Sequence, residues 1–296
     1  MTVNVVEASG LTKRFGKVEA VSDASFVVGE HSICGLLGRN GAGKTTLMHM
    51  LTGQEFASGG RVTLYGQSPV ENAGVLSRTC FIKESQAYPD GFRGKHVLRA
   101  AAWIYPQWDH HLAAELVAEF GVPLDRKMKR MSRGQRSAIG VVVGIASRAE
   151  LTIFDEPYAG LDAVARRTFY DRLLRDYGVH PRTILMSTHL IDEVADLLDH
   201  VLVIDGGRIV IDAESDELRG SATTVAGRHA VVQKFARDRE VLTWDSLGGL
   251  ATVTLNGLSD TDRSDAHAAG LDVVPVSLQQ LIIGRTRGTA REDNAS

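Results

Sequence analysis

Cysteine is scarce in this chain, which contains only Cys34 and Cys80 among 296 residues. Two cysteines cannot build a disulfide framework, and their spacing matches no common zinc motif. Small secreted scaffolds and cysteine-rich metal domains are therefore excluded, and this usage fits a reducing, cytosolic compartment. Cys34 lies within a short apolar run, so we expect it in the core.

Long apolar runs and an excess of positive charge are also absent. The longest apolar run, residues 139–146, contains two glycines and is far shorter than the roughly 20 residues that span a bilayer. The N-terminal segment lacks the basic residues that open a signal peptide. A formal net charge of -3 and a pI near 6.4 argue against non-specific nucleic-acid binding. The chain is expected to be soluble and cytoplasmic.

The most informative segment is residues 38–45, which read G-R-N-G-A-G-K-T. An apolar run at 33–37 precedes it, and apolar residues at helical spacing follow from Lys44 onward. This is the GxxxxGK[ST] phosphate-binding loop, in which backbone N–H groups point at phosphate oxygens at the start of a helix. Lys44 is expected against the β- and γ-phosphates, and the Thr45 hydroxyl on Mg²⁺. The expected nucleotide-binding residues here are Gly38, Arg39, Asn40, Gly41, Ala42, Gly43, Lys44, Thr45 and Thr46.

A second apolar run, residues 151–154, ends in two adjacent carboxylates, Asp155 and Glu156. A carboxylate at the end of a strand can complete the coordination of Mg²⁺, and its neighbour can orient or deprotonate an attacking water. We therefore expect Asp155 to be a metal ligand and Glu156 to be catalytic.

Strand-like runs before residue 65 and after residue 150 flank a helical region. The expected strands are 3–8, 24–28, 33–37, 61–65, 151–154, 183–186 and 201–204, and the expected helices are 97–105, 112–120 and 136–146. This alternation predicts an α/β fold with a mostly parallel, doubly wound sheet. Beyond residue 220 the order strand, helix, strand, strand, helix, strand matches a ferredoxin-like module. Its expected elements are 223–226, 228–237, 241–244, 251–255, 260–269 and 271–276.

Further motifs follow in an order that resembles the ATP-binding-cassette (ABC) transporter ATPases. M-S-R-G-Q-R at 131–136 resembles the family's L-S-G-G-Q signature, and P-Y-A-G-L-D at 157–162 resembles its D-loop. S-T-H at 187–189 resembles its switch histidine, and Phe15 lies where the family places an aromatic that stacks on adenine. With the two phosphate motifs, the resemblance covers roughly residues 5–220. It is closest to the ATP-binding subunits of ABC-2-type drug, antibiotic or lipid exporters.

The resemblance implies a P-loop NTPase cassette over residues 1–220, with a mixed sheet core and a helical subdomain at about 85–150. A small α+β accessory domain would occupy 221–284, and a flexible tail 285–296. The cassette would bind ATP and Mg²⁺, pair with a second ABC ATPase subunit and drive a separate transmembrane permease subunit. It would lie on the inner face of the membrane through that permease, and it would bind no nucleic acid.

The same resemblance implies roles for residues outside the phosphate loop. Ser132, Gly134 and Gln135 would grip the ATP held by the opposite subunit, and His189 would sense its own γ-phosphate. The D-loop residue Asp162 joins this nucleotide-binding set. Two positions depart from the family pattern. Arg133 replaces a signature glycine, and Glu84 replaces a glutamine that touches Mg²⁺. Glutamate can still be an oxygen ligand, so Glu84 is expected on the metal together with Thr45 and Asp155, although it adds a charge. Both changes bear on the turnover rate.

Other functions compete with this interpretation. A kinase with the same loop would need a lid for the acceptor and would not need the signature or His189. A cassette ATPase acting on ribosomes or DNA is the main alternative, although only one phosphate loop and no sustained heptad run are present. Trp103 and Trp108 either pack inside the helical subdomain or contribute to an interface. The sequence leaves open the transported molecule, the direction of transport, and homodimer versus heterodimer.

Overall fold

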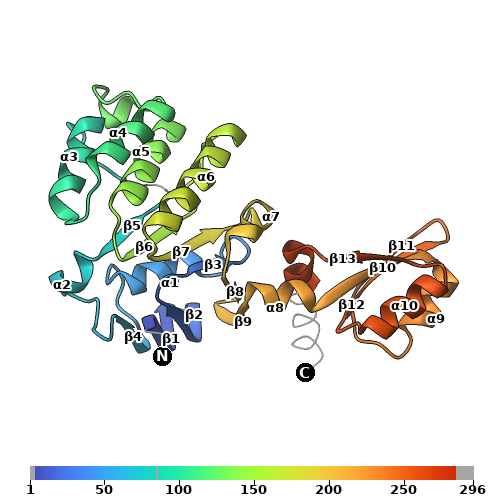
Figure 1. Cartoon of the computed structure of the whole chain (residues 1–296). Helices are drawn as coiled ribbons and strands as arrows, with labels where there is room; N and C mark the ends of the chain where they lie inside the picture. The colour runs from blue at the N-terminus through green and yellow to red at the C-terminus, as the bar shows by residue number, and fades with distance from the viewer. Residues whose placement is uncertain (1–3, 85, 285–296) are drawn as a thin grey trace. The chain divides into compact units, whose positions relative to one another are not determined.

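The computed structural model describes residues 4–84 and 86–284 and divides the chain into two compact units (Figure 1). The first unit comprises the chain up to His189 together with His200–Asp212. The second comprises Leu190–Asp199 and the chain from Ala213 onward. The expected domain boundary lies at residue 221. The second unit also includes the short helical segments at 191–197 and 215–220.

The elements of the first part of the chain follow the expected alternation, although most are longer than their apolar runs. The strands are β1 (Asn4–Phe15), β2 (Val18–Gly29), β3 (Ile33–Leu37), β4 (Gly59–Leu64), β5 (Thr79–Ile82), β6 (Leu151–Asp155), β7 (Thr183–Thr188), β8 (His200–Asp205) and β9 (Arg208–Glu214). The helices are α1 (Lys44–Leu51), α2 (Ala73–Leu76), α3 (Gly94–Ile104), α4 (His110–Glu119), the 3-10 turn η1 (Met128–Arg130), α5 (Arg133–Ala146) and α6 (Ala163–Val179).

Two sheets form the core of this unit. Six strands lie in the order β5-β6-β7-β3-β8-β9, and the pairs among β5, β6, β7, β3 and β8 are parallel. Every residue of β3, β6 and β7 is buried, as expected for parallel strands covered on both faces. Three antiparallel strands, in the order β2-β1-β4, form the second sheet. The expected α/β cassette fold is confirmed.

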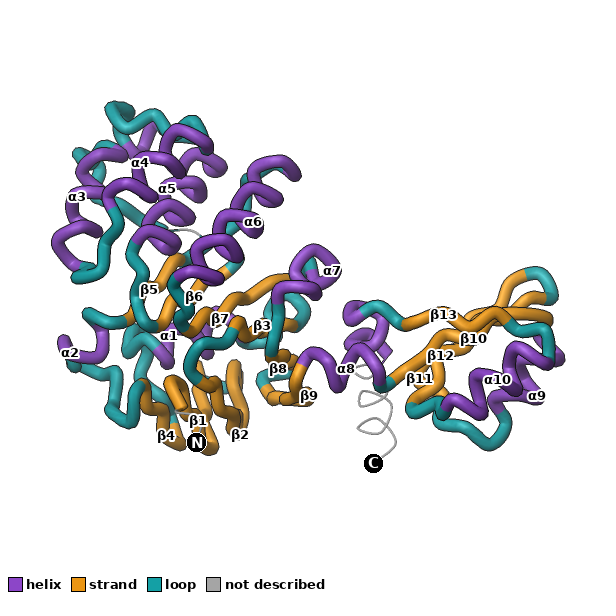
Figure 2. The backbone as a smooth tube through the Cα atoms, viewed as in Figure 1, coloured by secondary structure: helices purple, strands orange, loops and turns teal. Residues whose placement is uncertain are grey.

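Helices and loops alone occupy the stretch from α3 to α5 (Figure 2). α5 contacts α3, α4 and the strands β5 and β6, so it joins this helical region to the six-stranded sheet. The approach is close, because a Cβ on Gly144 would lie 2.3 Å from a ring carbon of Phe154. Trp103 of α3 is 81% exposed, so it does not pack inside the helical region.

The second unit contains the expected ferredoxin-like module. Its elements are α7 (Ile191–Val194), the 3-10 turn η2 (Ala195–Leu197), α8 (Ser215–Gly220), β10 (Ala222–Arg228), α9 (His229–Ala236), β11 (Val241–Leu247), β12 (Leu250–Asn256), α10 (Asp260–Ala268) and β13 (Asp272–Pro275). The sheet order is β11-β12-β10-β13 and every pair is antiparallel, which confirms the βαββαβ arrangement. A separate core that includes Val225, Val253 and Phe235 joins the sheet to α9.

Among the described residues, no helix is both long and apolar enough to cross a bilayer. The expected flexible tail, residues 285–296, lies outside the described residues.

Candidate functional site

The phosphate loop lies between β3 and α1, where the sequence predicts it. Gly43 caps α1 with a φ of 112°, a conformation that glycine adopts without a Cβ penalty. The loop is also tightly packed. A Cβ on Gly38 would lie 2.3 Å from the carbonyl oxygen of Ile204, and one on Gly43 would lie 2.5 Å from that of Ala20. Both positions therefore require glycine for space, and Gly43 requires it for its conformation as well.

Lys44 extends back over its own loop. Its Nζ donates to the carbonyl oxygens of Gly38 at 2.9 Å and Arg39 at 3.1 Å. The side chain is only 6% exposed, and Nζ lies 3.8 Å from a carboxylate oxygen of Glu156. This buried cation is positioned to meet a phosphate bound in the loop.

Asp155 ends β6 and is held from both sides by hydroxyl groups. Thr45 Oγ1 donates to Asp155 Oδ2 at 2.8 Å, and Ser187 Oγ donates to Asp155 Oδ1 at 2.7 Å. The structure thus brings Thr45 and Asp155, both expected on Mg²⁺, into direct contact. Ser187 belongs to the S-T-H motif, but no separate role was predicted for it from sequence. Its contact with Asp155 follows from the parallel pairing of β6 with β7.

Glu156 follows directly and has an unusual backbone conformation, with a φ of 45°. Such a conformation costs on the order of 1–3 kcal/mol in a non-glycine residue, and it clusters at functional sites. The backbone N–H of Glu156 donates to Ser187 Oγ at 3.0 Å, and His189 Nδ1 lies 3.0 Å from Glu156 Oε2. The two expected catalytic residues, Glu156 and His189, are therefore hydrogen-bonded to each other.

Lys44, Thr45 and Glu156 border a cleft of about 340 Å³, whereas Asp155 and His189 are not among its lining residues. Its lining residues are Ala20, Asn40, Gly41, Gly43, Lys44, Thr45, Thr46, Glu84 and Glu156. Among residues 4–84 and 86–284, no three His, Cys, Asp or Glu side chains form a group that could hold a metal. Mg²⁺ commonly uses one or two carboxylates together with substrate phosphates. The Thr45 and Asp155 oxygens fit that kind of site.

His49, in helix α1, has a lowered pKa. Burial lowers the pKa of His49 from its usual value of 6.5, and the nearby Lys83 lowers it further. Its ring packs edge-on against Phe81, with 5.8 Å between the ring centroids. His49 is therefore maintained as a neutral, packed side chain rather than a charged one.

The signature residues begin α5. Ser132 is the N-cap, and its Oγ accepts from the backbone N–H of Gln135 while the Gln135 side chain accepts from the N–H of Ser132. A Cβ on Gly134 would lie 2.4 Å from the carbonyl oxygen of Gly160, so the helix start touches the D-loop backbone. None of Ser132, Gly134 and Gln135 lines the phosphate-loop cleft of its own chain.

Two further predicted residues also lie away from that cleft. Asp162 caps α6, where its Oδ1 accepts from the backbone N–H of Ala165 at 2.8 Å. Phe15, at the end of β1, is 47% exposed, and the Lys13 ammonium lies 4.8 Å from its ring centroid. Neither residue borders the cleft.

Known proteins are similar to this chain. A family model described as "ABC transporter" matches residues 21–159. The daunorubicin/doxorubicin resistance ATP-binding protein DrrA of Streptomyces peucetius is 31% identical over 227 residues, covering 73% of this chain and 67% of DrrA. The bacitracin transport ATP-binding protein BcrA of Enterococcus faecalis is 30% identical over 220 residues, covering 72% of this chain and 70% of BcrA. The chain belongs to the ABC transporter family.

More distant matches extend this ABC assignment. The ABC transporter ATP-binding protein YtrB of Bacillus subtilis (strain 168) is 23% identical over 97% of this chain and all of YtrB. A solved ATP-binding subunit of an ABC transporter covers 73% of the chain and 92% of its own length with a TM-score of 0.65 at 23% identity, which shows the fold. The ATP-binding proteins of this family hydrolyse ATP to drive transport, and this ABC protein is one of them. The comparisons give no support to the alternative that acts on ribosomes or DNA.

Proposed function

We propose that this ABC ATPase powers export through a membrane-spanning subunit that is a separate polypeptide. The observation that carries the proposal is Asp155 held between Thr45 and Ser187, next to the buried Lys44. That arrangement suits the hydrolysis of a magnesium-bound triphosphate. Similarity to DrrA, a drug resistance protein, and to BcrA, a bacitracin transport protein, favours export.

Residues in and around the cleft contribute different parts of the chemistry. Lys44 exchanges the carbonyl oxygens of its own loop for β- and γ-phosphate oxygens when ATP binds. Thr45, Asp155 and Glu84 would hold Mg²⁺, which neutralises phosphate charge. Glu156 orients the attacking water and accepts its proton, and His189 keeps the Glu156 carboxylate in place while it hydrogen-bonds the γ-phosphate. The remaining loop residues supply backbone N–H groups, and Phe15 stacks on the adenine.

We propose that the signature residues act on a second ABC ATPase subunit. Ser132, Gly134 and Gln135 lie outside their own cleft, as expected for residues that complete the site of a neighbour. Asp162 also lies outside the cleft, and we assign it to the same set of residues. A twofold arrangement of two such chains, identical or closely related, would place each signature over the ATP held by its mate. Closure and opening of that pair would transmit work to the permease.

The helical subdomain, about residues 85–150, is proposed to dock on the permease, which would hold the protein at the inner face of the membrane. Trp103, largely exposed on α3, is the kind of aromatic side chain that contributes to interface hot spots. The module at residues 221–284 is proposed to be an accessory domain that supports pairing or regulation.

The nucleotide part of the proposal is tested by substituting Lys44. Lys44→Ala removes two charge-assisted contacts to phosphate and should weaken the binding of a fluorescent ATP analogue at least about 100-fold. The matched control is Lys234→Ala, which removes an exposed lysine of α9 and should leave the affinity unchanged. Equal affinity in the Lys44→Ala protein would contradict the assignment of the loop.

The transport part is tested by expressing the tagged chain with its candidate permease in membranes. The complex should co-purify in mild detergent, and export of a drug or peptide from inverted vesicles should depend on ATP and on Lys44. Trp103→Ser should weaken co-purification without changing nucleotide affinity. Purification with ribosomes and without any membrane protein would instead support the alternative function.

A further inference from the structure

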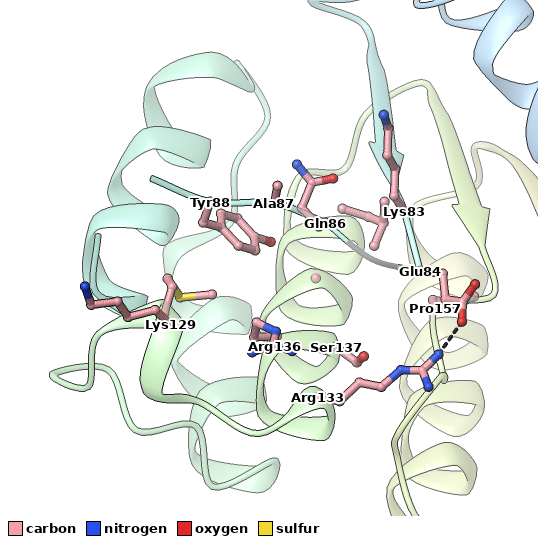
Figure 3. Close-up of a pocket in the computed structure, with 13 residues that line it drawn as sticks. Lys83, Glu84, Gln86, Ala87, Tyr88, Lys129, Arg133, Arg136, Ser137 and Pro157 are labelled. Atoms are coloured by element: carbon pink, nitrogen blue, oxygen red, sulfur yellow. Dashed lines mark hydrogen bonds and ion pairs between the residues drawn. The ribbon is translucent and has the colours of Figure 1, made fainter. Parts of the chain in front are cut away.

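The two residues that depart from the family pattern are bonded to each other. The guanidinium Nη2 of Arg133 forms an ion pair with Oε1 of Glu84, from a segment 49 residues earlier in the chain. Figure 3 shows Arg133 reaching from the start of α5 toward Glu84, beside Pro157. Both residues also line a pocket of about 360 Å³ between the helical region and the sheet. A glycine and a glutamine at these positions could not form this ion pair.

Glu84 belongs to two environments at once. It lines the phosphate-loop cleft together with Lys44, Thr45 and Glu156, and it also lines the pocket that contains Arg133. Its carboxylate oxygens are suitable ligands for a divalent cation. An oxygen paired with a guanidinium is less available to a cation, because the two positive charges compete for the same lone pairs.

Arg133 contacts both the start of the signature helix and the D-loop. It is the first residue of α5, directly between the cap Ser132 and Gly134. A Cβ on Gly160 would lie 2.9 Å from Arg133 Cγ, so the arginine stem packs on the D-loop turn. Ser137 Oγ also donates to the carbonyl oxygen of Ala159 at 2.5 Å. The guanidinium therefore extends from a part of α5 that is fixed to the segment following Glu156.

We propose that Arg133 is a positioning residue that competes with the divalent cation of the bound nucleotide for the carboxylate of Glu84. The inference rests on the proposed ATP site, which supplies that cation. Loading of the cleft draws Glu84 away from Arg133 and releases the guanidinium at the start of the signature helix. The Glu84–Arg133 pair thus couples nucleotide binding in a chain's own cleft to its signature residues, which are proposed to contact the ATP of the second subunit.

The exposure of the pair sets the size of the expected effect. The Arg133 and Glu84 side chains are 59% and 42% exposed, so solvent screens their attraction. Exposed ion pairs contribute little, and the corresponding change in an equilibrium is about 2- to 5-fold. A contact of this strength can break and re-form in each cycle of nucleotide binding.

The test is a double-mutant cycle on the Mg²⁺ dependence of nucleotide binding. A fluorescent, non-hydrolysable ATP analogue is titrated with Mg²⁺ in the wild type, Arg133→Ala, Glu84→Gln and the double variant. Arg133→Ala should lower the half-saturating Mg²⁺ concentration about 2- to 5-fold, because Glu84 no longer has a competing partner. The same substitution in the Glu84→Gln background should change nothing. In EDTA, wild type and Arg133→Ala should bind the analogue equally.

Arg130→Ala is the matched control, since it removes the same charge from an exposed arginine of η1. It should leave the Mg²⁺ dependence unchanged, and an equal shift would reduce the effect to net charge and overturn the inference. A shift on Arg133→Ala that is the same size with and without Glu84→Gln would also overturn it. A higher Mg²⁺ requirement in Arg133→Ala would overturn it too, by showing that the arginine assists binding. Wild-type protein that fails to bind the analogue would refute the proposed function itself.

Discussion

A methyl group added to Gly134 tests the contact between the signature helix and the D-loop. In Gly134→Ala the new Cβ would lie 2.4 Å from the carbonyl oxygen of Gly160 and 3.3 Å from its carbonyl carbon. Both neighbours are backbone atoms, so no flexible side chain can move aside. The start of α5 and the D-loop must separate by about 0.6 Å to reach a tolerable 3.0 Å contact.

The expected magnitudes follow from that displacement. Overpacking costs about 1–3 kcal/mol, and the better helix propensity of alanine offsets up to about 1 kcal/mol of it. The free energy of unfolding should therefore fall by up to about 3 kcal/mol. Turnover should fall about 10- to 100-fold, because misplacing a catalytic element by about 1 Å has effects of that size. The affinity of the single, unpaired chain for a nucleotide should stay near wild type, since Gly134 does not line the cleft of its own chain.

Denaturant unfolding, steady-state ATPase rates and binding of a fluorescent ATP analogue would measure the three quantities. Gly178→Ala is the matched control, because Gly178 lies in α6 and a Cβ there meets no atom within 4 Å. That variant should be as active as the wild type and at least as stable, because alanine has the better helix propensity. A Gly134→Ala protein with full turnover and full stability would refute the reasoning.

Three further substitutions test other parts of the structure. Glu156→Gln should bind ATP normally yet hydrolyse it about 10²- to 10⁴-fold more slowly, and near-normal turnover would place the base elsewhere. Asp176→Asn should lower the free energy of unfolding by about 3 kcal/mol, because Asp176 lies buried between Arg148 and Arg182; a loss below about 1 kcal/mol in denaturant titrations would contradict this. The lowered pKa of His49 means that the unfolded chain binds a proton first as pH falls below 6.5. Stability should therefore decrease below pH 6.5 in the wild type but less so in His49→Gln, and parallel loss of stability in the two proteins on acidification would contradict the burial of His49.

The sequence predicted the order of the elements better than their ends. Helix α5 was expected from Arg136 but begins at Arg133. The pattern Ser-x-x-Gln at 132–135 is a capping box, yet the apolar periodicity of the helix starts only after it. The strand β5 was not anticipated. It has only four residues, and its pairing with β6 is a contact with distant sequence rather than a local preference.

The second unit shows why topology can still be predicted. Six short elements in the order strand, helix, strand, strand, helix, strand have few compact arrangements, because parallel crossovers are right-handed and short hairpins are antiparallel. The observed sheet order is the one expected for a ferredoxin-like module. Errors of a few residues at element ends did not alter that result.

Side-chain contacts at the candidate site were predicted only in part. The Thr45–Asp155 contact follows from two motifs that serve one phosphate site, and both residues were identified from sequence. The Arg133–Glu84 pair could not be identified in this way. Each residue is visible as a departure from the family pattern, but their proximity depends on how α5 packs against the segment after β5.

The phosphate loop packs against both sheets of the first unit. Ala20, from the antiparallel sheet, and Ile204, from the parallel sheet, press their carbonyl oxygens against two different glycines of the loop. The turn after β8 ties them further, since the N–H of Gly207 donates to Ala42 and its carbonyl accepts from Ser22. A small displacement of one sheet relative to the other would therefore move the backbone of the phosphate loop. We therefore expect substitutions in β1 and β2 that shift Ala20 to change the affinity for a nucleotide without contacting it.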